Sequence, residues 1–145
     1  MSNGKHGKDA YFSLEDSAGS TLRNISQYVT NVTFSRSNDN HDTSTYGDEG
    51  HTFINGLTNG TITVDGLFDV TASTGSMTVL DSLVGLDGMT AGFEWGPLGN
   101  TPTSNPKYSG ECILTSLDHS APVADIITFS ATLQITGDVT KSTFA

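Results

Sequence analysis

The chain has 145 residues and a formal net charge of −10 at pH 7, with 34% hydrophobic and 15% charged residues. This length suits one domain with a sizeable core, and a polar remainder made mostly of Ser, Thr, Asn and Gly favours strands and turns. Six scattered basic residues argue against phosphate binding, and the single cysteine, Cys112, excludes an intramolecular disulfide and a cysteine-based zinc site.

Alternating apolar residues predict the first strands. The first strand carries Ala10, Phe12 and Leu14 on one face and ends at a turn over 17–20. A second strand over 21–25 is interrupted at 26–28. A third strand follows, with Val32 and Phe34 on one face.

The polar segment from Ser35 to Gly50 is predicted to be a long extended loop, and we place the function there. Ordinary connections are about 4–6 residues, and structureless ones beyond about 12–15 are usually functional or disordered. The segment also carries one large aromatic residue, Tyr46, among polar groups. After it, two short strands over 51–57 and 61–69 are predicted around an Asn59-Gly60 turn, because Asn-Gly is a strong hairpin signal.

One helix is predicted over 74–86, where apolar residues recur at helical spacing and should face the sheet. Ser73, Thr74 or Ser76 could be its N-cap, and Gly85 or Gly88 could end it. A short strand over 90–95 and a loop over 96–106 come next. The strand that follows, over 107–117, places on one face Tyr108, Cys112 and Leu114.

The clearest alternation in the chain covers 127–136. Its apolar side consists of Ile127, Phe129, Ala131, Leu133 and Ile135, and every residue between them is polar. One face of this strand should therefore be buried and the other should meet solvent or a water-filled channel.

These elements predict a mostly β fold: two antiparallel sheets packed as a sandwich, with the helix at one edge or end. We expect one domain over 1–145, with a flexible stretch over 1–9 and a short tail over 137–145. The first residues carry charges without a following apolar region, so we expect no signal peptide. No apolar run approaches the roughly 20 residues of a membrane span.

Several motifs in this order resemble the tail tube (major tail) proteins of long-tailed bacteriophages. They are Asp42-Thr-Ser-Thr-Tyr-Gly-Asp48, Gly56-Leu57, Asn59-Gly60-Thr61 and Gly66-Leu-Phe-Asp69. Before them, Asn24-Ile-Ser-Gln-Tyr-Val-Thr30 resembles the family's opening of two strands around a short turn. The resemblance covers most of 11–136.

The resemblance implies a two-sheet fold of the tail tube type and a structural virion protein without catalytic residues, cofactor or metal. Family members pair sheet edges into closed rings, commonly hexamers, that stack into a tube for DNA ejection. The implied partners are other copies of the chain, the tail tip or initiator, the tape measure and the tail terminator proteins. DNA would pass through the lumen without specific binding, and the protein would be assembled in the host cytoplasm and reside in the virion tail.

Two sets of residues are candidates for these roles. The set expected to contact an adjacent subunit or ring is Asp42, Thr45, Tyr46, Gly47 and Asp48. The set expected to face the lumen is Thr61, Thr63, Asp65, Thr132 and Gln134. An acidic surface suits a conduit along which DNA slides, although acidity also aids solubility.

Other interpretations stay open at this point. The chain could be another virion β-sandwich, such as a tail terminator or a capsid decoration protein. It could also be a ligand-binding or carbohydrate-binding module, in which Trp95 would stack on a sugar instead of closing the core. The acids between Asp39 and Glu49 do not match calcium-loop spacing, so we expect a solvated acidic loop there. Cys112 is expected to be a small buried residue.

Overall fold

The computed structural model describes residues 10–16, 21–72, 75–85, 90–99 and 104–144. Within these ranges the chain forms seven strands, one α-helix and one short 3-10 helix. In chain order they are β1 (Tyr11–Glu15), β2 (Leu22–Asn24), the 3-10 helix (Ser26–Tyr28), β3 (Val29–Asp42), β4 (Phe53–Leu67), α1 (Ser76–Ser82), β5 (Ala91–Gly96), β6 (Pro106–Ser120) and β7 (Thr128–Thr143).

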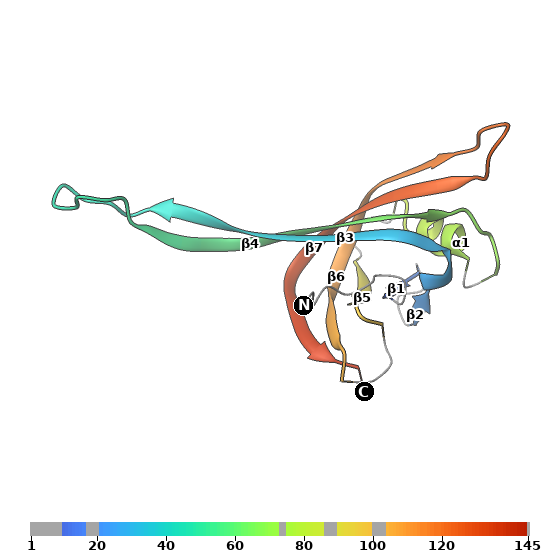
Figure 1. The fold of residues 1–145 in the computed structure, drawn as a ribbon, viewed down its shortest axis with the longest axis horizontal. Coiled ribbons are helices and arrows are strands. Elements are labelled where there is room, and N and C mark those ends of the chain that lie inside the picture. Colours follow the sequence, from blue (N-terminus) through green and yellow to red (C-terminus); the bar gives the residue numbers. More distant parts are fainter. Residues whose placement is uncertain (1–9, 17–20, 73–74, 86–89, 100–103, 145) are drawn as a thin grey trace, which may run out of the picture.

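All seven strands belong to one antiparallel sheet in the order β2-β1-β5-β6-β7-β4-β3 (Figure 1). The sheet folds over on itself, because the ring of Phe34 in β3 lies 6.1 Å from the ring of Phe93 in β5. These strands are four places apart in the sheet order.

The mostly β fold with one helix is therefore confirmed, and the two predicted layers are two halves of one hydrogen-bonded sheet. Strands β6 and β7 are long enough to run through both halves. Their pairing has register shifts between Ser109 and Glu111 and between Leu114 and Ser116. Such bulges bend a strand and increase its twist, which allows the sheet to turn back without breaking.

The core fills the space between the two halves. The predicted alternation is confirmed where Phe129, Ala131, Leu133 and Ile135 are buried, but Ile127, expected on the same side, is 41% exposed because it lies before β7 begins. Helix α1 adds its own apolar residues to this core, and those with little exposure are Met77, Val79 and Leu80.

The predicted loop over 35–50 is half strand. Strand β3 continues to Asp42, β4 begins at Phe53, and the connection covers only 43–52. We call residues 37–59 the arm, and Figure 1 shows it extending away from the body. Polar composition suggested a loop, but strand pairing inside the hairpin satisfies the backbone of Ser, Asn and Asp residues as well as that of apolar ones.

The predicted Asn59-Gly60 turn is wrong, because β4 runs straight through it. Gly60 pairs with Arg36, and Asn59 pairs with Ser37. Gln134 of β7 holds this stretch extended: its side-chain amide donates to Asn59 Oδ1 at 2.6 Å and to the Gly60 carbonyl at 2.9 Å. The glycine serves close packing, since an added Cβ would lie 2.8 Å from Ile135 Cδ1.

Two other boundaries differ from the prediction. Helix α1 is shorter than 74–86, and Gly75 is its N-cap residue, because the Ser76 hydroxyl donates to the Leu67 carbonyl instead. Gly85 has φ of 78°, as expected of a glycine that ends a helix. The predicted tail over 137–145 is strand up to Thr143, where β7 still pairs with β6. The expectations for 1–9, the turn over 17–20, Ser73, Thr74 and Gly88 lie outside the described residues.

Candidate functional site

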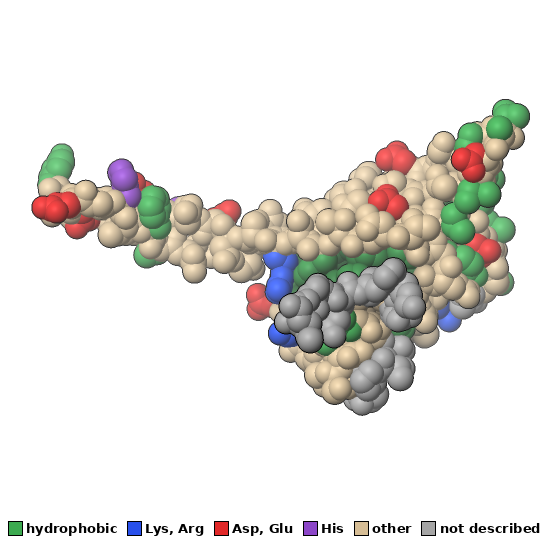
Figure 2. All heavy atoms as spheres, in the orientation of Figure 1, with side chains coloured by type: hydrophobic (Ala, Val, Ile, Leu, Met, Phe, Trp, Pro, Cys, Tyr) green, Lys and Arg blue, Asp and Glu red, His purple; other side chains and the backbone are tan. Residues whose placement is uncertain are grey.

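The arm exposes large apolar side chains that no other part of the described chain covers. Tyr46 is fully exposed, and Phe53, Ile54 and Leu57 are more than half exposed. Figure 2 shows these apolar groups along the arm, interspersed with acidic ones. A lone two-stranded hairpin is marginally stable in water, and exposed apolar patches mark interaction sites. The arm therefore has the properties of a contact surface.

The turn at the end of the arm is built by the residues predicted to act there. Asp48 accepts hydrogen bonds from the Thr45 backbone N–H at 2.7 Å and from its hydroxyl, and the Asp48 N–H donates to the Thr45 carbonyl at 3.0 Å. This closed turn holds Tyr46 and Gly47 at its apex. All five predicted contact residues thus lie together at the arm tip.

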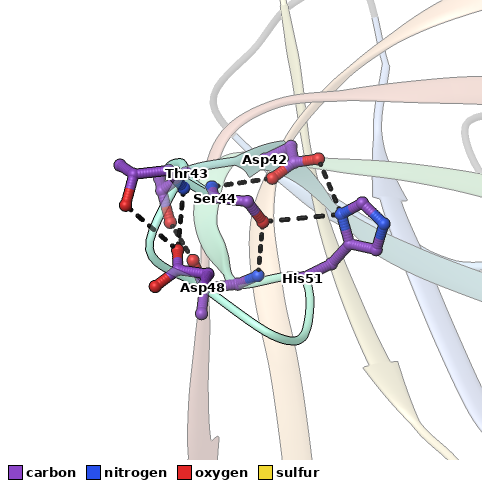
Figure 3. A network of polar contacts seen from close by, with 7 residues as sticks. Asp42, Thr43, Ser44, Asp48 and His51 are labelled. Carbon is purple, nitrogen blue, oxygen red and sulfur yellow. Dashed lines mark hydrogen bonds and ion pairs between the residues drawn. The ribbon is translucent and has the colours of Figure 1, made fainter.

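A second set of polar contacts fixes the base of that turn (Figure 3). Asp42 Oδ1 accepts from the Ser44 N–H at 2.8 Å, and Asp42 Oδ2 lies 3.3 Å from His51 Nδ1. The Ser44 hydroxyl accepts from the Thr52 N–H at 2.8 Å. The hydrogen bonds from Ser44, with a smaller effect from His51, hold the pKa of Asp42 below its usual value of 3.8. Asp42 therefore carries a negative charge at neutral pH.

The five residues predicted to face a lumen share one face of the sheet. Thr61 pairs with Gln134, Thr63 pairs with Thr132, and Asp65 follows on the same face of β4. The residues between them on β4, Ile62 and Val64, are fully buried on the other face.

This polar face continues across four neighbouring strands. Its three cross-strand rows are Ser35–Thr61–Gln134–Ile113, Thr33–Thr63–Thr132–Ser116 and Asn31–Asp65–Ser130–Asp118. These rows carry hydroxyl, amide and carboxylate groups with one isoleucine, and none of their members is Lys or Arg. We call these rows the polar face.

The polar face is formed by β3, β4, β7 and β6. Within the described chain, this four-stranded part of the sheet has a free hydrogen-bonding edge on each side. β3 is last in the sheet order, so its outer edge is unpaired. β6 pairs with β5 only from Tyr108 to Cys112, which leaves its far half, Ile113–Ser120, open on that side. Long open edges are sites at which another chain can add strands.

Trp95 and Cys112, the other residues considered in the sequence, contribute to the core. Trp95 packs against the core, as expected for core closure. Cys112 is fully buried, its thiol lies 3.3 Å from the Ala91 carbonyl, and burial raises its pKa to about 12. Among the described residues, no group of three or more His, Cys, Asp or Glu side chains could hold a metal ion. The helix that the structure describes is too short to cross a membrane.

Two features could not be found from local sequence patterns. One is the stacking of Arg36 on the neighbouring rings of Phe34 and Tyr108, which depends on strands far apart in the chain. The other is a second projection, formed where β6 and β7 meet (Figure 1), which exposes Val123, Ile126 and Ile127.

Comparison with known proteins supports one class of fold. No protein-family model and no curated protein matches the chain. Among solved structures, a chain in the tail of an empty gene transfer agent particle, refined with C6 symmetry, is similar with a TM-score of 0.75 and 15% identity, over 96% of this chain and 99% of that one.

Two further structures give the same result. The SPP1 tail tube has a TM-score of 0.74 at 12% identity, covering 97% of this chain and 80% of that one. A chain of an extracellular contractile injection system, from its PVC sheath-tube complex, has a TM-score of 0.69 at 13% identity, covering 99% and 94%. The fold is that of tail tube proteins. The resemblance in the sequence is confirmed at this level.

Proposed function

We propose that the chain is a structural subunit of a tail tube in a phage or phage-like particle, and that it acts by self-assembly without catalysis. One observation carries the proposal. A four-stranded antiparallel sheet has one polar face, one buried face and a free edge on each side, within a fold of the tail tube type. A sheet of this kind is suited to being extended by copies of itself.

The strand directions support closure into a ring. In the order β6-β7-β4-β3 each neighbour is antiparallel, so β3 and β6 run in opposite directions. If the copies are related by rotation about the axis of the ring, the β6 edge of one copy therefore faces the β3 edge of the next copy and runs antiparallel to it. Repeated pairing would join the sheets into a barrel without open edges. We propose a hexameric ring, in line with the C6 symmetry stated for the similar gene transfer agent tail.

The proposed lumen is lined by the polar face, including Thr61, Thr63, Asp65, Thr132 and Gln134. Hydroxyl and amide groups with two aspartates and no Lys or Arg offer no strong contact to phosphate. DNA would slide past such a wall and enter the host without specific binding.

The arm is the proposed contact between subunits or rings, through Asp42, Thr45, Tyr46, Gly47 and Asp48. A contact between unlike surfaces propagates as rings stack, and so builds a tube. Further partners would be the tail tip or initiator, the tape measure and the tail terminator proteins. The chain would assemble in the host cytoplasm and reside in the virion tail.

A tail terminator is the second candidate, because the fold is also similar to a chain of a contractile injection system sheath/tube terminator structure, with a TM-score of 0.69 and 14% identity. A terminator would stop at one ring, whereas a tube subunit would form open-ended polymers.

Negative-stain electron microscopy of the purified chain, with light scattering over a concentration series, tests the proposal. We expect hollow tubes of uniform width that grow with concentration, while isolated single rings would favour the terminator. Tyr46→Ala should weaken assembly and leave the circular dichroism spectrum unchanged, because the Tyr46 side chain makes no contact within the body. A chain that stays monomeric at high concentration and binds sugars would contradict a tube role.

A further inference from the structure

A groove lies where the arm meets the body. It has a volume of about 670 Å³, and β3, β4 and β7 line it with polar and apolar groups. The lining residues that matter here are Arg36, Ile135, Asp138 and Val139. It is separate from the polar face, because Arg36 shares its side of β3 with Phe34, which packs against the core.

Arg36 is held at this groove as a cation without an acidic partner. Its guanidinium carbon lies 5.4 Å from the ring centroid of Phe34 and 5.3 Å from that of Tyr108. Within the described chain, no ion pair is formed by Arg36, although Asp138 lines the same groove. Stacking on two aromatic faces fixes the guanidinium and leaves its N–H donors available for a carboxylate.

Positive charge collects around this point in a chain that is otherwise acidic. Lys141 lies directly opposite Tyr108 in the β6–β7 pairing, and so is on the same face of the sheet as the Tyr108 ring on which Arg36 stacks. Figure 2 shows basic side chains gathered where the arm leaves the body, with an acidic group beside them and separate acidic groups elsewhere on this face.

The arm tip carries the complementary charges. Besides Asp42 and Asp48, which build the turn, Glu49 is exposed and makes no hydrogen bond or ion pair within the described residues. The fully exposed Tyr46 precedes it by three residues at the same tip. From Arg36 to Asp42 the extended arm spans roughly 20 Å at about 3.3 Å per residue, so the tip of one chain cannot reach its own groove.

We propose that this groove receives the arm tip of a second copy, with Glu49 on the Arg36 guanidinium and Tyr46 against Ile135 and Val139. The inference rests on the proposed function, which supplies the second copy. The tip and the groove are different surfaces at opposite ends of the arm. The contact therefore repeats from copy to copy without closing on a pair.

Charge reversal tests the contact. Arg36→Glu and Glu49→Arg should each raise the critical concentration for tube assembly about tenfold, the effect of losing one desolvated charge pair. The double variant, Arg36→Glu with Glu49→Arg, should restore assembly because the pair is reversed. The matched control combines Glu49→Arg with Arg23→Glu. Arg23 pairs with Asp16 at 3.2 Å on β2, so this combination should restore nothing.

A second measurement does not depend on variants. In wild-type tubes made from mixed isotope-labelled copies, a carbodiimide should join the Lys141 amine to the Glu49 carboxylate between copies, as detected by mass spectrometry. Lys107 and Glu94, 3.7 Å apart, supply the internal positive control within one copy.

The possible outcomes distinguish failure of the groove contact from failure of the tube role. Wild-type tubes with no Lys141–Glu49 link, or a double variant no better than the single ones, would overturn this inference and leave the tube role intact. If the groove held DNA instead, Arg36→Glu would abolish binding of a short duplex and leave assembly unchanged, which would also overturn it. A wild-type chain that forms no tubes would remove both proposals.

Discussion

Gly66 is placed where β4 passes closest to the 3-10 helix. It pairs with Val29, and a Cβ added there would overlap the Tyr28 carbonyl oxygen and lie 2.9 Å from Val29 Cα. These neighbours are backbone atoms that cannot move aside. At Gly60, by contrast, an added Cβ would meet the end of the flexible Ile135 side chain. Gly66 and Gly60, which both lie in β4, are therefore required to different degrees.

Gly66→Ala should lower the free energy of unfolding by about 1–3 kcal/mol, because overpacking forces the backbone apart. Gly60→Ala should cost less, since Ile135 can change rotamer. Gly50→Ala, at a site with nothing within 4 Å, should change stability by no more than about 0.5 kcal/mol. Urea unfolding of the monomeric protein measures all three, and equal values at Gly66 and Gly50 would contradict this account.

At the scale of elements, strand positions were more predictable than their ends. A strand was predicted at each of the seven positions, although β4 was predicted as two strands around a turn, and alternation was clearest where one face meets the core, as in β1 and β7. The β3 half of the arm was predicted as loop, since both of its faces are exposed and leave no alternation to detect, whereas part of its β4 half was predicted as strand over 51–57. The Asn59-Gly60 turn was wrong for a related reason: its extended form depends on Gln134, which lies on another strand.

The candidate site was likewise predictable only where its residues are close in sequence. The tip residues are close together in sequence, so their proximity could be predicted, and Thr45 and Asp48 close the turn that holds them. The stacking of Arg36 on Phe34 and Tyr108 joins β3 to β6, and no local pattern reveals such a contact.

The arm tip should respond to acid. The folded-state pKa of Asp42 lies below its usual value of 3.8, so its hydrogen bonds stabilise the tip above that pH. This contribution should be lost as the pH falls through the depressed pKa. Amide hydrogen exchange at Ser44, measured from pH 6 to pH 2.5 and corrected for intrinsic rates, should show protection falling only at the acid end. In Asp42→Asn the protection should not vary with pH, and an unchanging wild-type profile would contradict the assignment.

At the scale of the whole molecule, two surfaces have separate tasks in the proposed tube. In that proposal the polar face lines the lumen, and the arm and its groove join copies. They lie on opposite sides of β3, because Thr33 and Ser35 belong to one and Arg36 to the other. Changes to one surface should therefore leave the other working.

Asp65→Lys should give tubes of normal appearance but slower DNA ejection, because a cation on the lumen wall attracts phosphate. Asp81→Lys is the matched control: it changes the net charge equally but lies on α1, which packs against the apolar side of the sheet. Electron microscopy measures assembly, and dye-detected DNA release from reconstituted particles measures ejection. Ejection at the wild-type rate with Asp65→Lys would count against the lumen assignment.

The open edges of β3 and β6 also set how the bore of such a tube can vary. Each copy inserts four strands into the barrel wall, and neighbouring strands lie about 4.8 Å apart, so one additional copy lengthens the circumference by roughly 19 Å before strand tilt. Intermediate widths would require an unpaired strand or a broken ladder. Mutations in this chain should therefore leave the tube diameter unchanged or alter it by adding or removing a whole copy from the ring. Tube diameter is then a discrete trait under selection.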